Sequence, residues 1–159
     1  MYQIYPMTRE AAREIQKWVY EKPYSLYCFS GDDEELDELM SGSYVSVWND
    51  NHLVGYFCFG EPAKVPAGIK EGVYEENHID IGLGMHPTET GKGKGLTFLQ
   101  AGLDYAIRAH LASSFRLTVA SFNQRARKVY EREGFGYIQS FVNHTGERPI
   151  PFDVMVKMN

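Results

Sequence analysis

The stretch from His78 to His110 restricts the fold most, because its hydrophobic period changes at a glycine-rich turn. From His78 to Met85, every second residue is isoleucine, leucine or methionine, which predicts a strand with one apolar face. From Gly95 to His110, leucine and isoleucine recur at helical spacing. A strand that leads through a glycine-rich turn into a helix favours a fold of the α/β class.

The turn between this strand and this helix has the composition of an anion site. Glycines at positions 91, 93 and 95 let the backbone approach a ligand closely and adopt positive φ angles. Their N–H groups, with the positive end of the following helix, would attract an anion, and Lys92 and Lys94 add charge. A flexible connection would explain the same loop about as well. Neither the Walker spacing nor the G-x-G-x-x-G spacing is present, so ATP and NAD are disfavoured.

Two glycines inside the predicted strand need a reason, because glycine weakens a strand. Gly82 and Gly84 share a face with His78 and Asp80. One interpretation is a shallow surface without side chains, with titratable groups at one end. The other is that the glycines accommodate the packing of a neighbouring helix.

In a second segment, Asn123–Phe135, residues Asn123 to Glu133 are predicted to form a helix that follows a strand. Asn123 suits the N-cap, and Gly134 suits the C-terminal end. Asn123, Ala126 and Tyr130 lie on one helical face, where a small residue between two polar ones suits a narrow ligand. Taken singly, Tyr130 is more typical of a half-buried packing residue.

The remaining pattern predicts one domain over residues 1–159 with a mixed α/β sheet covered by helices. The expected strands and helices, in addition to those above, are a strand at 2–5, helices at 8–20 and 32–40, a hairpin at 43–48 and 53–59, and strands at 115–120, 137–142 and 152–158.

Composition narrows the function classes. The formal net charge is −5 and there is no clustered basic surface, which disfavours nucleic-acid binding. No apolar run is long enough to span a bilayer, and the start lacks a signal-peptide pattern. Cys28 and Cys58 show no metal-ligand spacing and are predicted to be small buried residues. These observations predict a cytoplasmic protein without a metal and without a membrane partner.

The two segments together, Met85-His86-Pro87 with Gly91–Gly95 and Asn123…Ala126…Tyr130…Gly134-Phe135, closely resemble the GNAT acyltransferase superfamily. The resemblance implies a mixed, mostly antiparallel sheet that is splayed between strands 4 and 5 and flanked by helices, with acetyl-CoA in the cleft. It implies cofactor contacts from the following residues: Leu83, Met85, Thr90, Gly91, Lys92, Gly93, Lys94, Gly95, Asn123, Ala126 and Tyr130. Thr90 stands where the family usually has Arg or Gln, which puts one phosphate contact in doubt.

The resemblance also implies a reaction, the transfer of an acetyl group from acetyl-CoA to a primary amine of a small molecule or peptide. The amine must lose a proton before it attacks the thioester directly. Tyr130 matches the family's acid for the departing thiolate. Asp80 is the first candidate for the base, with His78 and Glu76 as alternatives.

The resemblance further implies an acceptor pocket formed by the first two helices and the last two strands. Four aromatic residues lie at the end of the first predicted helix and just after it: Tyr20, Tyr24, Tyr27 and Phe29. Such side chains would either bind a cationic amine or pack against the sheet. Two other functions stay open. One is a non-catalytic acyl-CoA-binding or sensing module, and the other is an interaction protein that has lost cofactor binding. A homodimer is also left open.

Overall fold

In a computed structural model, which describes residues 1–110 and 113–158, helices and strands follow the predicted order. Their bounds are β1 (Gln3–Pro6), α1 (Arg9–Gln16), α2 (Asp33–Leu39), β2 (Tyr44–Asn49), β3 (His52–Phe59), α3 (Pro66–Lys70), β4 (Ile79–Met85), α4 (Gly95–His110), β5 (Ser114–Ala120), α5 (Gln124–Glu133), β6 (Gly136–Asn143) and β7 (Ile150–Met158). The short helix α3 is the one α-helix of this list that the sequence pattern did not predict.

The chain divides into two compact units. An N-terminal unit comprises Met1–Cys58 and Leu83–Lys94, and a C-terminal unit comprises Phe59–Gly82 and the chain from Gly95 onward. Strand β4 therefore contributes its first residues to the C-terminal unit and its last residues to the N-terminal unit. The prediction of one domain stays a prediction.

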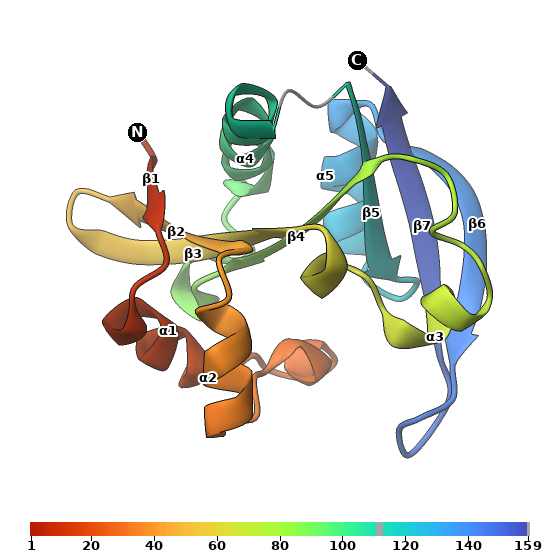
Figure 1. The fold of residues 1–159 in the computed structure, drawn as a ribbon, viewed down its shortest axis with the longest axis horizontal. Coiled ribbons are helices and arrows are strands. Elements are labelled where there is room, and N and C mark those ends of the chain that lie inside the picture. Colours follow the sequence, from red (N-terminus) through yellow and green to blue (C-terminus); the bar gives the residue numbers. More distant parts are fainter. Residues whose placement is uncertain (111–112, 159) are drawn as a thin grey trace. The chain divides into compact units, whose positions relative to one another are not determined.

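The N-terminal unit is built on antiparallel strands. Strand β2 pairs with β1 on one side and with β3 on the other. The β2–β3 hairpin turns at Asp50 and Asn51, whose φ angles of 49° and 69° give the twist that a two-residue hairpin needs. Figure 1 shows α1 and α2 on the same side of this hairpin. The apolar side of α1 packs there, with Ala11, Ile15 and Trp18 gathered around Leu53.

Helix α1 begins as predicted and ends earlier. The Thr8 hydroxyl accepts a hydrogen bond from the Ala11 N–H, which caps the first turn. The predicted end was Tyr20, but the helix stops at Gln16 and its last turn tightens, with the Trp18 N–H donating to the Ile15 carbonyl. Residues 17–20 therefore lie outside the helix.

The C-terminal unit contains the parallel pair. Strand β4 pairs with β5 in parallel at Ile79↔Phe115 and Asp80↔Arg116. Strand β7 lies between β5 and β6 and is antiparallel to both, as Figure 1 shows. With β4 shared by the two units, the strand order is β1-β2-β3-β4-β5-β7-β6. The sheet is thus mixed and mostly antiparallel, and the described parallel register between β4 and β5 covers the first two residues of β4.

Helices α4 and α5 pack on each other in the C-terminal unit. A Cβ added at Gly95, the first residue of α4, would lie 3.1 Å from a methyl group of Val129 in α5. Gly95 therefore allows close packing of the two helices. Among the described residues, no helix combines the length and the apolar character that crossing a membrane demands.

Candidate acyl-CoA site

The end of β4 presents one backbone edge away from β3. The His86 N–H donates to the Val54 carbonyl at 2.8 Å, so the backbone groups of His86 face β3. Successive residues of a strand alternate the edge to which their N–H and C=O groups point. The backbone groups of Leu83 and Met85, the two residues of β4 that were predicted to contact the cofactor, therefore point to the opposite edge.

The face that carries Gly84 is covered. A Cβ built at Gly84 would overlap the ring of Tyr56, which packs directly on the strand. Phe29 and Tyr44 pack in turn against Tyr56, with ring centroids 5.6 Å and 6.0 Å away. Of the two interpretations of this glycine, the structure supports packing accommodation, but the neighbour is the ring of Tyr56 from strand β3 and not the predicted helix. The shallow surface without side chains is absent at Gly84.

The loop after β4 has the backbone of an anion-binding turn. Gly91 and Gly93 adopt φ angles of 70° and 75°, in the left-handed region that favours glycine. A Cβ at Gly93 would meet nothing within 4 Å, so its neighbours leave the approach open. The Thr90 hydroxyl donates to the Pro87 carbonyl at 2.8 Å. The hydroxyl proton of Thr90 is therefore engaged in a hydrogen bond inside the loop. The Arg or Gln that the family usually has at this position would instead present N–H donors outside the loop.

The charge of this loop is partly balanced by the loop itself. The Lys94 ammonium lies 3.0 Å and 3.2 Å from the two carboxylate oxygens of Glu89. Lys92 is exposed. An anion bound at Gly91–Lys94 would therefore meet backbone N–H groups and two lysines. Lys94 already has the carboxylate of Glu89 beside it.

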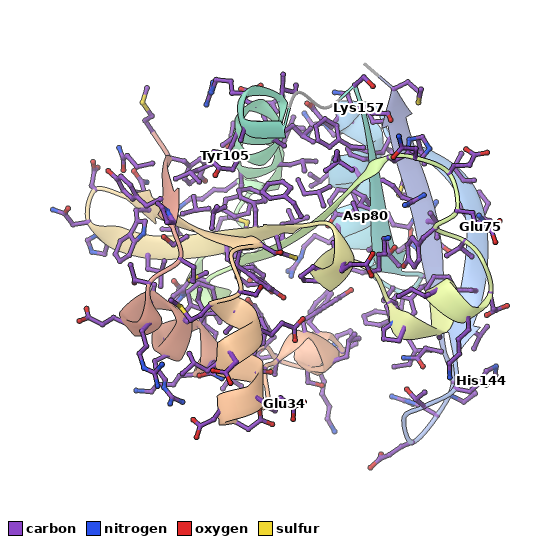
Figure 2. All side chains as sticks on the ribbon, viewed as in Figure 1. Glu34, Glu75, Asp80, Tyr105, His144 and Lys157 are labelled. Carbon is purple, nitrogen blue, oxygen red and sulfur yellow. The ribbon has the colours of Figure 1, made fainter. Side chains whose placement is uncertain are left out.

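Asp80, at the start of β4, holds a buried arginine. Both oxygens of its carboxylate accept from the Arg116 guanidinium at 2.7 Å, and each side chain is 3% exposed. Figure 2 marks Asp80 in the C-terminal unit. A carboxylate bound in this way has little freedom to take a proton from a substrate, so the geometry favours a structural role over the predicted role as base. Arg116 itself was missed, although an arginine inside an apolar strand is a signal of a buried acidic partner.

The two alternative bases lie near this pair. The Nδ1 of His78 is 2.7 Å from the Ser114 hydroxyl oxygen, and its Nε2 is 3.6 Å from a carboxylate oxygen of Glu76. The His78 side chain is 10% exposed and that of Glu76 is 89% exposed. His78 thus joins the start of β4 to the start of β5, and only Glu76 is open to water.

The second predicted segment forms α5 as expected. The Asn123 side chain accepts from the Ala126 N–H at 3.1 Å and caps the helix, and Gly134 ends it with a φ of 104°. Tyr130 is buried, and its ring meets Phe135 edge-on at 6.2 Å. One face of α5 therefore presents Asn123, Ala126 and Tyr130 in the predicted arrangement.

One contact at the end of β4 was not predicted. The Tyr20 hydroxyl donates to the Met85 carbonyl at 2.6 Å. Burial raises the pKa of this phenol well above its usual range, and the nearby Cys28 thiol adds to the effect. The other three aromatic residues of the region, Tyr24, Tyr27 and Phe29, are half-buried.

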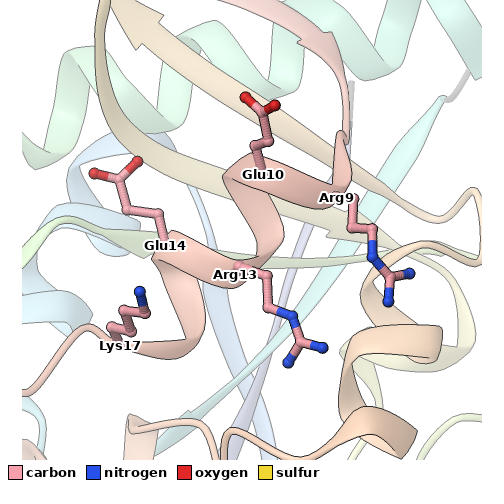
Figure 3. A pocket seen from close by; sticks show the side chains of 5 residues that line it. All are labelled: Arg9, Glu10, Arg13, Glu14 and Lys17. Carbon is pink, nitrogen blue, oxygen red and sulfur yellow. The ribbon is translucent and has the colours of Figure 1, made fainter.

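A hollow along α1 is a poorer candidate for a ligand. Five charged residues line it, and Figure 3 shows Glu10 and Glu14 along one side of the helix and Arg9 and Arg13 along the other. The Arg13 guanidinium is already paired with Asp33 at 2.9 Å. All five lining residues carry charged groups on one exposed helix, so this hollow is better explained as the solvated face of α1.

Several solved structures share the fold. The spermidine/spermine N-acetyltransferase SpeG from Vibrio cholerae, in mutant form, matches with a TM-score of 0.72 at 19% identity, over 99% of this chain and 95% of that one. A GNAT-family acetyltransferase from Bacillus anthracis matches with a TM-score of 0.73 at 16% identity, over 99% and 94%. The putative acetyltransferase yncA from Salmonella typhimurium, solved with acetyl-CoA, matches with a TM-score of 0.69 at 16% identity, over 99% and 93%.

Sequence comparison gives the family. No curated protein sequence matches the chain significantly. The sequence model described as the acetyltransferase (GNAT) family matches residues 6–135, which include β4, the glycine loop and α5. The chain therefore belongs to the GNAT family of acetyltransferases.

Proposed function

We propose that this protein is an N-acetyltransferase that moves an acetyl group from acetyl-CoA to a primary amine of a small molecule or peptide. The loop Gly91–Lys94 carries the proposal, because Gly91 and Gly93 adopt positive φ angles, which are typical of turns whose backbone N–H groups bind anions. We assign the pyrophosphate to this loop and to Gly95, and the pantetheine arm to the backbone of Leu83 and Met85. Asn123, Ala126 and Tyr130 are assigned to the same cofactor.

The reaction requires two proton transfers. A neutral amine attacks the thioester carbonyl, the C–S bond breaks, and the thiolate takes a proton. Tyr130 is our candidate for the acid. Arg116 holds the carboxylate of Asp80, so we assign the removal of the amine proton to water. Glu76, whose exposed carboxylate lies just before β4 in the sequence, is our candidate for the side chain that assists this water. We also propose a cytoplasmic location, because two cysteines, Cys28 and Cys58, are too few for the disulfide framework of a secreted protein.

The test is a panel of amines with acetyl-CoA, read by the release of free thiol. Polyamines come first, because one structure of similar fold is a spermidine/spermine N-acetyltransferase. Amino acids, aminoglycosides and peptide N-termini complete the panel. Thiol release with one class of amine, above the rate without amine, supports the proposal.

A non-catalytic acyl-CoA-binding module is the second candidate. The positive φ angles of Gly91 and Gly93 suit it as well, since a module that only binds the cofactor needs the loop but no acid or base. Tight binding of acetyl-CoA in calorimetry, without thiol release for any amine, would select this module over the enzyme.

A further inference from the structure

We infer that the carboxylate of Glu89 competes with the phosphates of the cofactor for Lys94, an inference that rests on the proposed function. The carboxylate holds the Lys94 ammonium, so a phosphate must displace it to gain that cation. Glu89 thereby sets the affinity for acetyl-CoA and for the product CoA, which share the same phosphates. All the contacts that carry this inference lie inside the N-terminal unit.

The first observation is how the carboxylate holds the lysine. The Lys94 ammonium lies 3.0 Å from one carboxylate oxygen of Glu89 and 3.2 Å from the other, so both oxygens share one cation. The Glu89 side chain is 17% exposed, whereas that of Lys94 is 42% exposed. The lysine is therefore the more accessible member of the pair, and an anion that approaches the loop from water can contact it.

The second observation is that the turn before the glycines has its own hydrogen bonds. The Glu89 N–H donates to the His86 carbonyl at 2.8 Å, and the Thr88 N–H donates to Nδ1 of the His86 ring at 3.1 Å. The Thr90 hydroxyl donates to the Pro87 carbonyl at 2.8 Å. These three hydrogen bonds fix the backbone of the turn without the Glu89 carboxylate. Support of the loop by the ion pair is therefore the weaker explanation of the pair.

The third observation is the sign of the charges. The Glu89 carboxylate and a phosphate group are both anions, so they repel each other, and Lys94 attracts both. Replacing Glu89 by glutamine removes the repulsion and makes the Lys94 ammonium available, and both effects favour phosphate binding. The loss of the pair itself costs little stability, because ion pairs in contact with water contribute weakly.

The test is calorimetric titration of acetyl-CoA into wild type, Glu89→Gln and Glu133→Gln, which needs no acceptor amine. Glu133 is the matched control, because its side chain is 15% exposed and its carboxylate lies 3.4 Å from the Lys157 ammonium, outside the glycine loop. Glu89→Gln should bind acetyl-CoA about threefold to tenfold more tightly than wild type. Glu133→Gln should bind it as wild type does.

A double-variant cycle separates competition for Lys94 from a simple effect of charge. If the two charges act independently on the phosphates, Lys94→Gln costs the same affinity in wild type and in Glu89→Gln. If Glu89 competes for the lysine, Lys94→Gln costs less affinity in wild type, where the ammonium is already engaged. We expect the two costs to differ by about twofold or more.

The salt dependence of the affinity is an independent measurement. In wild type, salt screens both the attraction of the phosphates by Lys94 and their repulsion by Glu89, and the two changes partly cancel. In Glu89→Gln only the attraction remains, so the affinity should fall more steeply as salt is raised. With an amine from the panel, the KM for acetyl-CoA should fall in this variant without a rise in kcat, because the phosphates are bound alike in the ground state and the transition state.

The failures are distinguishable. If acetyl-CoA binds to neither wild type nor Glu89→Gln, the proposed function is wrong and the inference about Glu89 fails with it. If wild type binds acetyl-CoA and Glu89→Gln binds it equally well, the proposed function stands and Glu89 is not a competitor. Weaker binding by Glu89→Gln would also overturn the inference, because the ion pair would then support the loop.

Discussion

Arg116 holds both carboxylate oxygens of Asp80 in a two-pronged contact at 2.7 Å, and neither side chain is more than 3% exposed. The same guanidinium also donates to the Glu76 carbonyl at 2.9 Å. It therefore ties the segment before β4, the start of β4 and the start of β5 into one network inside the C-terminal unit.

The first prediction concerns the stability of this network. Asp80→Asn leaves the buried guanidinium without its counter-charge, so the free energy of unfolding should fall by about 3–5 kcal/mol. Chemical denaturation measures it. Asp33→Asn is the matched control, because Asp33 pairs with Arg13 at the surface and its side chain is 87% exposed. That change should cost about 0–1 kcal/mol.

The same variant tests the role of Asp80 in the reaction. If Asp80 is structural, turnover by Asp80→Asn should fall in proportion to the folded fraction, and the pH profile of kcat/KM should keep its shape. Loss of the acidic limb of that profile in fully folded Asp80→Asn would restore Asp80 as the general base.

The second prediction concerns the glycine loop. Gly93→Val should weaken acetyl-CoA binding strongly, because an L-residue at a φ of 75° is strained by about 1–2 kcal/mol and its side chain fills the approach to the backbone. Calorimetric titration with acetyl-CoA gives the affinity. Lys92→Ala should have a smaller effect that fades at high salt.

Gly31→Val is the control for backbone strain. Gly31 has a φ of 86°, and a Cβ there, as at Gly93, would meet nothing within 4 Å. Both variants should lose similar stability, and only Gly93→Val should lose affinity. Equal acetyl-CoA affinity in Gly93→Val and wild type would remove the loop from the site.

The third prediction concerns alkaline pH. Burial raises the pKa of Tyr44 far above its usual range, with smaller contributions from Cys58 and Glu38. The unfolded chain then loses this proton first, above its ordinary pKa of about 10. The stabilisation is fully present below pH of about 10, and stability should fall by about 1.4 kcal/mol per pH unit for each such phenol above it.

Chemical denaturation between neutral and alkaline pH measures this slope in wild type, Tyr44→Phe and Tyr5→Phe. Deleting the Tyr44 hydroxyl should flatten the slope. Tyr5 is 54% exposed and serves as the control for the replacement of a tyrosine by phenylalanine. An identical slope in all three proteins would contradict the burial effect.

The sequence predicted the local elements well because caps and turns are local. Thr8, Asn123 and Gly134 cap the helices that the pattern assigned to them. The buried stripe of α4 was less well predicted, since Phe98 and Ala106 are fully buried while Ile107 is 39% exposed. Helical spacing gives a periodicity, but the neighbours that cover one side decide its orientation.

Contacts between distant segments could not be predicted. The end of α1 at Gln16 frees Tyr20 to reach Met85, which is 65 residues away in the chain. The partner of Asp80 is 36 residues away. No local sequence pattern indicates contacts between such distant positions. The sequence therefore suggested Asp80 as a base and gave no sign of its ion pair with Arg116.

The last prediction concerns Tyr130, because its role separates an enzyme from an acyl-CoA-binding module. The residue is buried on the face of α5 that also carries Asn123 and Ala126, and its ring packs against Phe135. Tyr130→Phe keeps the ring, so packing and most of the cofactor affinity should remain while the phenolic proton is lost. A contact made only in the transition state lowers kcat and kcat/KM together, and the KM for acetyl-CoA should stay similar.

Steady-state rates of thiol release should fall roughly tenfold to a thousandfold in Tyr130→Phe. Phe135→Leu is the control for the packing of the same pair, and it should reduce stability more than it reduces kcat in the folded protein. Full activity in Tyr130→Phe would mean that water protonates the thiolate. A rise in KM alone would make Tyr130 a binding residue, because the phenol would then stabilise the ground state and the transition state equally.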